Sequence, residues 1–290
     1  MRKIPVKMSI MMALMLVFMA FDFPEINREN HLLQSVADTT VIPEPCNASN
    51  QAFQDGEEVV YKIYYNWNFV WIPAGEVVFR VNDLGDQYHL SAKGRTYKSY
   101  DWFFKVRDDY DSYIDKSTLL PDISVRHVRE GGYRLYDKVT FDQNSRKAKS
   151  MRGKTPESAK LHEFTLDDCM HDVLSIIYYA RNINFNGLQE GQEIPIKIFL
   201  DKETYPLKVE YKGKEEKKRV KGNGKFSTHK FSPQLIAGDV FKEDDQMMVW
   251  VTDDENKLPL LIESPVSVGS VKAVLKSYKG LRHEFTAELD

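Results

Sequence analysis

The sequence predicts a mainly β fold, in which a large antiparallel sheet is curled into a barrel or half-barrel around one central α-helix. Short stretches of alternating apolar and polar residues recur along most of the 290-residue chain, as expected for half-buried strands. Aromatic residues, which favour strands, make up 12% of the sequence. Strands do not alternate with helices, so a parallel sheet is not indicated.

The central helix is predicted over residues 172–181. Acidic residues precede and begin it (Asp167, Asp168 and Asp172), where the helix dipole favours negative charge, and Arg181 ends it. Its apolar residues cover most of its circumference instead of forming one stripe. We therefore expect this helix to be buried on several sides.

The other elements are expected to be strands. Pro73-Ala74-Gly75 predicts a corner, Glu130-Gly131-Gly132 predicts a hairpin turn, and residues 153–160 read as a polar loop. A sheet of about a dozen strands must curl, split or close. The predicted strands are 59–65, 76–81, 88–96, 106–114, 123–128, 133–141 and 147–152 before the helix, and 194–200, 205–211, 219–220, 224–231, 247–252, 258–262 and 268–278 after it.

The N-terminus has the pattern of an export signal. Arg2, Lys3 and Lys7 precede an apolar stretch from Met8 to Ala20, which predicts a signal peptide over residues 1–20; an uncleaved anchor is the alternative. Residues 21–50 are expected to form a flexible leader, and 51–290 a single β-rich domain. We therefore expect an exported protein, periplasmic or at the cell surface, with no transmembrane span after signal removal.

Charge and cysteine content narrow the class of protein further. The formal net charge of −3 argues against a nucleic-acid partner, because such proteins carry basic surfaces. The chain has two cysteines, Cys46 and Cys169. In an oxidising compartment two such cysteines usually pair, so we expect a disulfide between them, with two buried free thiols as the alternative.

Three groups of residues resemble a known family. Gly56-Glu57 with Tyr61, Ile63 and Tyr65, then Ala74-Gly75, are similar to the opening of the bacterial domain-of-unknown-function 3108 (DUF3108) family. Asp172 to Arg181 resembles its central helix. The resemblance runs from about Gly56 to Leu275, and the long aromatic version in this chain is similar to exported proteins of Bacteroides-type bacteria. It implies export and a β-rich fold but supplies no reaction. Its closing strands are matched by Val249-Trp250-Val251-Thr252-Asp253-Asp254, Lys257, Pro259 and Gly269-Ser270.

An aromatic-rich region with interleaved charges is the best candidate for a ligand-binding site. Aromatic rings beside arginines can form a platform for a sugar or a lipid chain, although core packing explains many such rings equally well. The candidate ligand-binding residues are Trp67, Trp71, Arg95, Tyr100, Trp102 and Arg107.

Metal and catalytic motifs are weak by comparison. The crowded helix entrance has no HExxH or CxxC spacing, so we expect no metal site there. No phosphate loop, Rossmann glycine pattern or nucleophile elbow is present, so no cofactor and no catalytic residue is predicted. The side chains at this entrance that belong to types able to bind zinc are those of His162, Glu163, Asp167, Asp168, Cys169, His171 and Asp172.

These observations favour a non-catalytic binding or carrier module of the cell envelope, with an apolar or glycan ligand such as a lipid or a glycan fragment. One alternative is an envelope hydrolase that uses carboxylates near the aromatic residues, which would need an open cleft with two convergent acids. Another is a structural scaffold of an envelope complex, which a wide exposed apolar patch would favour. The sequence predicts neither a particular ligand nor an oligomeric state.

Overall fold

The computed structural model describes residues 46–67, 70–220, 222–235, 245–266 and 269–289. The predicted signal peptide and most of the predicted leader lie outside the described residues. The described chain forms one antiparallel sheet of 15 strands. These strands are β1 (Glu58–Trp67), β2 (Val70–Asp83), β3 (Gln87–Thr96), β4 (Arg107–Asp115), β5 (Pro121–Glu130), β6 (Tyr133–Asp142), β7 (Lys147–Gly153), β8 (Lys160–Thr165), β9 (Glu193–Leu200), β10 (Glu203–Val220), β11 (Gly224–Pro233), β12 (Met248–Thr252), β13 (Pro259–Pro265), β14 (Ser270–Lys279) and β15 (Glu288–Leu289).

The sheet consists of two runs of sequential hairpins that meet in the middle. Its order is β8-β7-β6-β5-β4-β3-β2-β1-β14-β13-β12-β11-β10-β9, and β15 pairs with β11. β1 joins the runs because it pairs with both β2 and β14. The edge strands β8 and β9 form no ladder with each other in the described chain, so the sheet is open. The prediction of a mainly β, antiparallel fold is confirmed, but the sheet does not close into a barrel.

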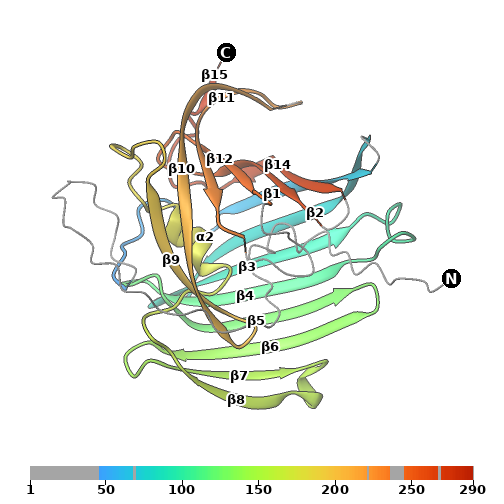
Figure 1. Cartoon of the computed structure of the whole chain (residues 1–290), viewed down its shortest axis with the longest axis vertical. Coiled ribbons are helices and arrows are strands. Elements are labelled where there is room, and N and C mark those ends of the chain that lie inside the picture. Colours follow the sequence, from blue (N-terminus) through green and yellow to red (C-terminus); the bar gives the residue numbers. More distant parts are fainter. Residues whose placement is uncertain (1–45, 68–69, 221, 236–244, 267–268, 290) are drawn as a thin grey trace.

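Side-chain contacts hold the two edges of the open sheet near each other. The rings of Phe164 on β8 and Phe199 on β9 lie 5.2 Å apart, within a small apolar cluster. Arg126 on β5 lies 2.6 Å from the carboxylate of Asp137 and 2.7 Å from that of Asp201, at the β9–β10 turn. The sheet is therefore curled, and Figure 1 shows β9 and β10 crossing over the part formed by β3 to β5.

The predicted helix is present but much shorter than expected. α2 spans only Ser175–Ala180. Asp172 accepts hydrogen bonds from the amides of Leu174 and Ser175, so these residues form a tight turn that delays the helix. A side-chain amide of Asn182 donates to the carbonyl of Tyr178, next to the end of the helix. The prediction of a helix over 172–181 is wrong in extent.

Burial of this short helix on several sides is confirmed. Ser175, Ile176, Tyr178 and Tyr179 are buried, and they lie on different faces. The segment leading into α2 also touches two distant strands, because Ser112 on β4 donates to Asp172 and residue 171 forms a bridge with residue 198 on β9. The helix is thus held between the two arms of the curled sheet (Figure 1).

Several element boundaries differ from the prediction. Residues 73–75 lie inside β2 and face a register shift at Ile63/Tyr64 of β1, so no corner forms there. A Cβ on Gly75 would lie 2.4 Å from the carbonyl oxygen of Arg95, so close strand pairing requires glycine. Strands β8 and β15 were not predicted, and β10 is one long strand instead of two.

The two cysteines are paired in the structure. Cys46 and Cys169 form a disulfide with a Cα–Cα distance of 5.6 Å. The bond connects the first described residue to the segment that leads into α2. Among the described residues, no helix is both long enough and apolar enough to cross a lipid bilayer.

Candidate functional site

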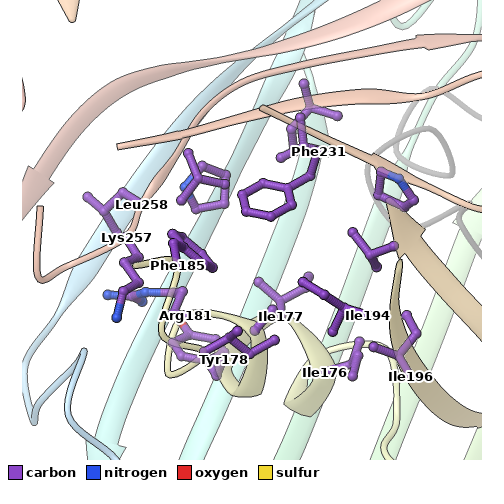
Figure 2. A pocket seen from close by; sticks show the side chains of 18 of the residues that line it. Ile176, Ile177, Tyr178, Arg181, Phe185, Ile194, Ile196, Phe231, Lys257 and Leu258 are labelled. Atoms are coloured by element: carbon purple, nitrogen blue, oxygen red, sulfur yellow. The ribbon is translucent and has the colours of Figure 1, made fainter. Parts of the chain in front are cut away.

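An apolar cavity of about 180 Å³ lies between α2 and the strands that curl over it. Figure 2 shows Arg181, Lys257 and Leu258 at one end, Ile194 and Ile196 at the other, and Phe231 opposite the helix. The cavity is lined by Val59, Tyr61, Phe79, Ile176, Ile177, Tyr178, Ala180, Arg181, Ile183, Phe185, Ile194, Ile196, Val209, Phe231, Pro233, Met247, Val249, Val251, Lys257, Leu258, Pro259 and Ile262.

Strand alternation explains why so many apolar side chains meet in this space. In β9, Ile194 and Ile196 are buried while Glu193 and Pro195 are exposed, so one face of the strand is apolar. The helix contributes the half-buried Ile177 from the opposite side. A cavity with such a lining stays dry or takes an apolar ligand, because water would find few polar partners.

Arg181 is charged and lines the cavity, but its charge is satisfied within the fold. Its guanidinium forms a bidentate ion pair with Glu57, at 2.6 and 2.8 Å, and donates to the carbonyl oxygens of Asn256 and Ala52. Burial opposes the charged form, but the neighbouring Glu57 outweighs burial and raises the pKa of Arg181. Arg181 therefore joins the end of α2 to the residue before β1 and to the turn before β13.

Lys257 is different, because it forms no ion pair within the described chain. Its ammonium lies 5.5 Å from the centre of the Phe185 ring. Burial lowers its pKa, Glu255 partly opposes this effect, and the charge of Arg181 adds to it. Its φ of 47° is uncommon for a residue other than glycine. A half-buried cation with room beside it could accept an anionic group at this end of the cavity.

A chain of hydrogen bonds supports the aromatic wall of the cavity from behind. The hydroxyl of Tyr211 lies 2.9 Å from Nδ1 of His229, and Nε2 of His229 lies 2.9 Å from Asp253. Burial lowers the pKa of His229; burial alone would raise that of Asp253, but Lys214, Ser227 and His229 hold it at about 2. Tyr211 and His229 do not line the cavity. Both rings contact Phe185 or Phe231, so the network positions these two lining residues.

The sequence-predicted ligand-binding residues do not line this cavity. Arg95 and Arg107 are register partners on β3 and β4 and lie beside each other. Tyr100 is buried and packs on Phe103, whereas 82% of Trp102 is exposed. The ring of Trp71 stacks under the ammonium of Lys272, 3.8 Å away. The side chain of Trp67 lies outside the described part of the structure.

The crowded helix entrance is built around the disulfide and buried hydrogen bonds. Asp168 accepts from the backbone amide of Cys169 and pairs with Arg146 and Lys197, so its charge is compensated. The bonded sulfurs of Cys46 and Cys169 offer no thiolate to a metal. His171 is buried and its Nδ1 lies 3.1 Å from Ser175 Oγ, while His162 is located on β8.

Two carboxyl groups converge where β4 begins and β5 ends. Asp108 and Glu130 are 0% and 4% exposed and share a hydrogen bond. Burial, together with the charge of Asp108, raises the pKa of Glu130 well above its usual range. Burial also raises the pKa of Asp108, although its hydrogen bond with Glu130 partly opposes this effect. The hydrolase alternative requires convergent acids in an open cleft. The carboxyl groups of Asp108 and Glu130 converge, but both are buried, so they do not lie in an open cleft.

Glu130→Gln is expected to make stability less dependent on pH. A carboxyl with a raised folded-state pKa keeps its proton in the folded protein after the unfolded chain has lost it. Its contribution is therefore present at acidic pH and declines as pH rises from the ordinary carboxyl range. Glutamine imitates the protonated acid and removes this decline, so the variant gains stability relative to the wild type at neutral pH.

Urea unfolding between mildly acidic and neutral pH measures this effect. Glu163→Gln is the matched control, because Glu163 is exposed on β8 and pairs only with the exposed Lys149. The same pH dependence in the wild type and the Glu130→Gln variant would contradict the assignment of a shared proton.

The fold and the cavity define the class of protein: an open, curled β-sheet protein with an apolar cavity beside its helix. The family model described as "Protein of unknown function (DUF3108)" matches residues 60–276. The chain therefore belongs to the DUF3108 family, as the sequence motifs indicated. No curated protein matches the chain.

One solved structure supports the fold. The chain is similar to a β-barrel-like protein of the domain-of-unknown-function 1849 family from Brucella abortus, with a TM-score of 0.52 and 8% identity, over 80% of this chain and 99% of that one. A Bacteroides fragilis protein with a YmcC-like fold, thought to be exported, matches with a TM-score of 0.29 and 10% identity, over the same shares. At such identities only the fold of the first is informative.

Proposed function

We propose that this protein is an exported, non-catalytic binding or carrier protein of the cell envelope, and that it holds one apolar chain in the cavity beside α2. In this proposal the curled sheet acts as a half-barrel around the helix. The observation that carries it is the cavity itself, with 20 of its 22 lining residues being neither acidic nor basic. Burial of a hydrocarbon chain there is favourable by about 25 cal/mol for each Å² removed from water.

An acyl chain fits this cavity better than a glycan. Each sugar hydroxyl that enters an apolar site loses a hydrogen bond to water, at a cost of about 1–3 kcal/mol when no protein partner replaces it. Arg181 is a poor partner for several hydroxyls, because Glu57 and two backbone carbonyls already occupy four of its five donors. The lining therefore favours a lipid chain over a glycan fragment.

The position of Lys257 favours a chain with an anionic head group. Lys257 lies at one end of the cavity (Figure 2), and the apolar side chains extend from it toward Ile194 and Ile196. A single-chain fatty acid has this same arrangement, with a charge at one end of a hydrocarbon tail. Its carboxylate beside Lys257 would also raise the depressed pKa of the ammonium.

Export is supported by two features of the chain. Residues 1–20 have the pattern of a signal peptide and 21–50 that of a flexible leader before the domain over 51–290. The disulfide between Cys46 and Cys169 is typical of proteins in oxidising compartments, such as the periplasm or the cell surface. A lipid carrier in either place would meet its ligand in the envelope.

Delipidated protein is expected to bind dodecanoate and to melt at a higher temperature in its presence, because a ligand of the folded state stabilises it. Val249→Trp should weaken binding at least about tenfold, since Val249 lines the cavity and an indole would fill it. Val78→Trp is the matched control: Val78 is also a half-buried strand residue, but it does not line the cavity.

The head group is tested with dodecanol and Lys257→Met. The variant should weaken binding of dodecanoate and leave that of dodecanol unchanged. Absence of binding by either compound to the delipidated wild type would refute the proposed function, and equal loss of both ligands in the variant would refute only the role of Lys257.

A further inference from the structure

A second hollow, of about 350 Å³, is lined in part by residues that flank the aromatic-rich segment 97–104 in the sequence, and it has a different chemistry. Its walls come from the end of β3, the start of β4 and the hairpin of β5 and β6. None of these residues lines the apolar cavity. We call it the basic hollow; it is lined by Arg95, Lys105, Arg107, Arg129, Gly131 and Arg134.

The acidic side chains around the basic hollow do not balance its charge. Asp109 pairs with both Arg95 and Arg129, and Asp101 pairs with Arg107 at 2.6 Å. Beneath them, Asp108 and Glu130 share a hydrogen bond, and both have a raised pKa. Five cations therefore face four carboxyl groups, two of which are harder to ionise than usual. This surplus is local, because the whole chain has a net charge of −3.

Two of the cations have no carboxylate partner within the described chain. Arg134 donates from Nη1 only to the carbonyls of Gly131 and Tyr133, which anchor it at the hairpin. The ammonium of Lys105 makes no hydrogen bond or ion pair among the described residues, and its side chain is exposed. Together with Arg129, which is half exposed, they form an accessible basic rim.

We propose that the basic hollow binds a phosphoryl group carrying two negative charges. Guanidinium groups present pairs of N–H donors that match phosphate oxygens, and several of them around one hollow favour a dianion over a single carboxylate. The backbone bonds of Arg134 and the ion pairs of Arg95 and Arg107 hold these groups in place before a ligand arrives, so less side-chain entropy is lost on binding.

Two sources could supply this group: a soluble phosphorylated compound or the head group of an anionic phospholipid. Isothermal titration with pyrophosphate tests the first. Co-sedimentation with vesicles of phosphatidylglycerol, compared with vesicles of phosphatidylcholine, tests the second. The test variant is Lys105→Ala/Arg129→Ala/Arg134→Ala, because all three side chains are exposed and their removal leaves the core untouched.

A control variant removes the same charge elsewhere. Lys147→Ala/Lys149→Ala/Lys208→Ala changes three exposed lysines that do not line the hollow. Both variants should melt like the wild type. We expect the test variant to bind pyrophosphate or phosphatidylglycerol vesicles at least about tenfold more weakly than the wild type and the control variant do. Affinity should also fall as salt is raised.

Each outcome decides the proposal. If the test variant loses binding of pyrophosphate but the wild type does not bind the vesicles, a soluble ligand is supported. If the test variant loses binding of the vesicles but the wild type does not bind pyrophosphate, a head group is supported. Absence of binding to both probes by the wild type would overturn the proposal. It would also be overturned if the test variant retained its affinity or if the control variant lost as much. None of these results depends on binding of dodecanoate in the apolar cavity.

Discussion

Arg181→Met is expected to lower the free energy of unfolding by about 3–5 kcal/mol, the usual cost of removing one partner of a buried ion pair. The side chains of Arg181 and Glu57 are 5% and 1% exposed. Without the arginine, Glu57 would remain buried without its countercharge, and the carbonyls of Ala52 and Asn256 would each lose a donor. The effect is large because one guanidinium links the helix, the residue before β1 and the turn before β13.

Urea denaturation of four proteins measures this effect: the wild type, Arg181→Met, Glu57→Met and the double variant. The double variant should be less destabilised than the sum of the single variants, since no unpaired charge remains. Arg80→Met is the matched control, because Arg80 pairs with the adjacent Glu58 at 2.7 Å on the surface, where such pairs are worth about 0–1 kcal/mol. A loss in Arg181→Met no larger than in this control would contradict the assigned role.

Removal of the disulfide by Cys46→Ala/Cys169→Ala is expected to lower the free energy of unfolding by about 4–5 kcal/mol. The bond joins residues 123 positions apart, so the unfolded chain without it gains the freedom of a long open loop. Cys169 also precedes the turn at Asp172, so the segment that places α2 should become less protected from hydrogen exchange than the β1–β2 hairpin.

The same effect can be measured without a mutation. Reduction of the wild type should lower its unfolding midpoint to that of the double variant, and the reductant should leave the variant unchanged. If reduction shifted both proteins equally, or neither, the bond would not be the source of the difference.

Strand positions were predictable because alternation in a half-buried strand is a local property of the sequence. Most strands of the observed sheet overlap a predicted strand. The extent of the helix was not predictable in the same way. Residues 172–175 lie between acidic residues and an apolar stretch, a pattern that suits the start of a helix. The Asp172 carboxylate, itself fixed by Ser112 on a distant strand, instead accepts hydrogen bonds from two amides of a turn. Only tertiary contacts reveal this choice.

The candidate site was harder to predict for the same reason. The cavity is assembled from nine separate segments of the chain, each of which looks like ordinary core in isolation. The density of aromatic residues instead predicts a binding site around Trp102, where Tyr100 packs in the core. Arg95 and Arg107 were identified from sequence and do lie together, but their partners Arg129 and Arg134 come from another hairpin.

The charged residues in the family motifs do indicate a buried ion pair from the sequence alone. Glu57 and Arg181 are opposite charges placed beside strongly apolar stretches, and a buried charge usually has a partner. Lys257 is also within the matched region. Its neighbours in sequence, Asn256 and Leu258, are buried, which is an unusual setting for a lysine.

The most direct test of the proposed lipid site is an NMR measurement of contacts between bound dodecanoate and assigned methyl groups of the delipidated protein. The account predicts intermolecular cross-peaks from the acyl chain to the methyls of Ile177 and Val249, and none to Val78. Saturation with dodecanoate that leaves Ile177 and Val249 unperturbed, or cross-peaks confined to residues outside the cavity, would contradict it.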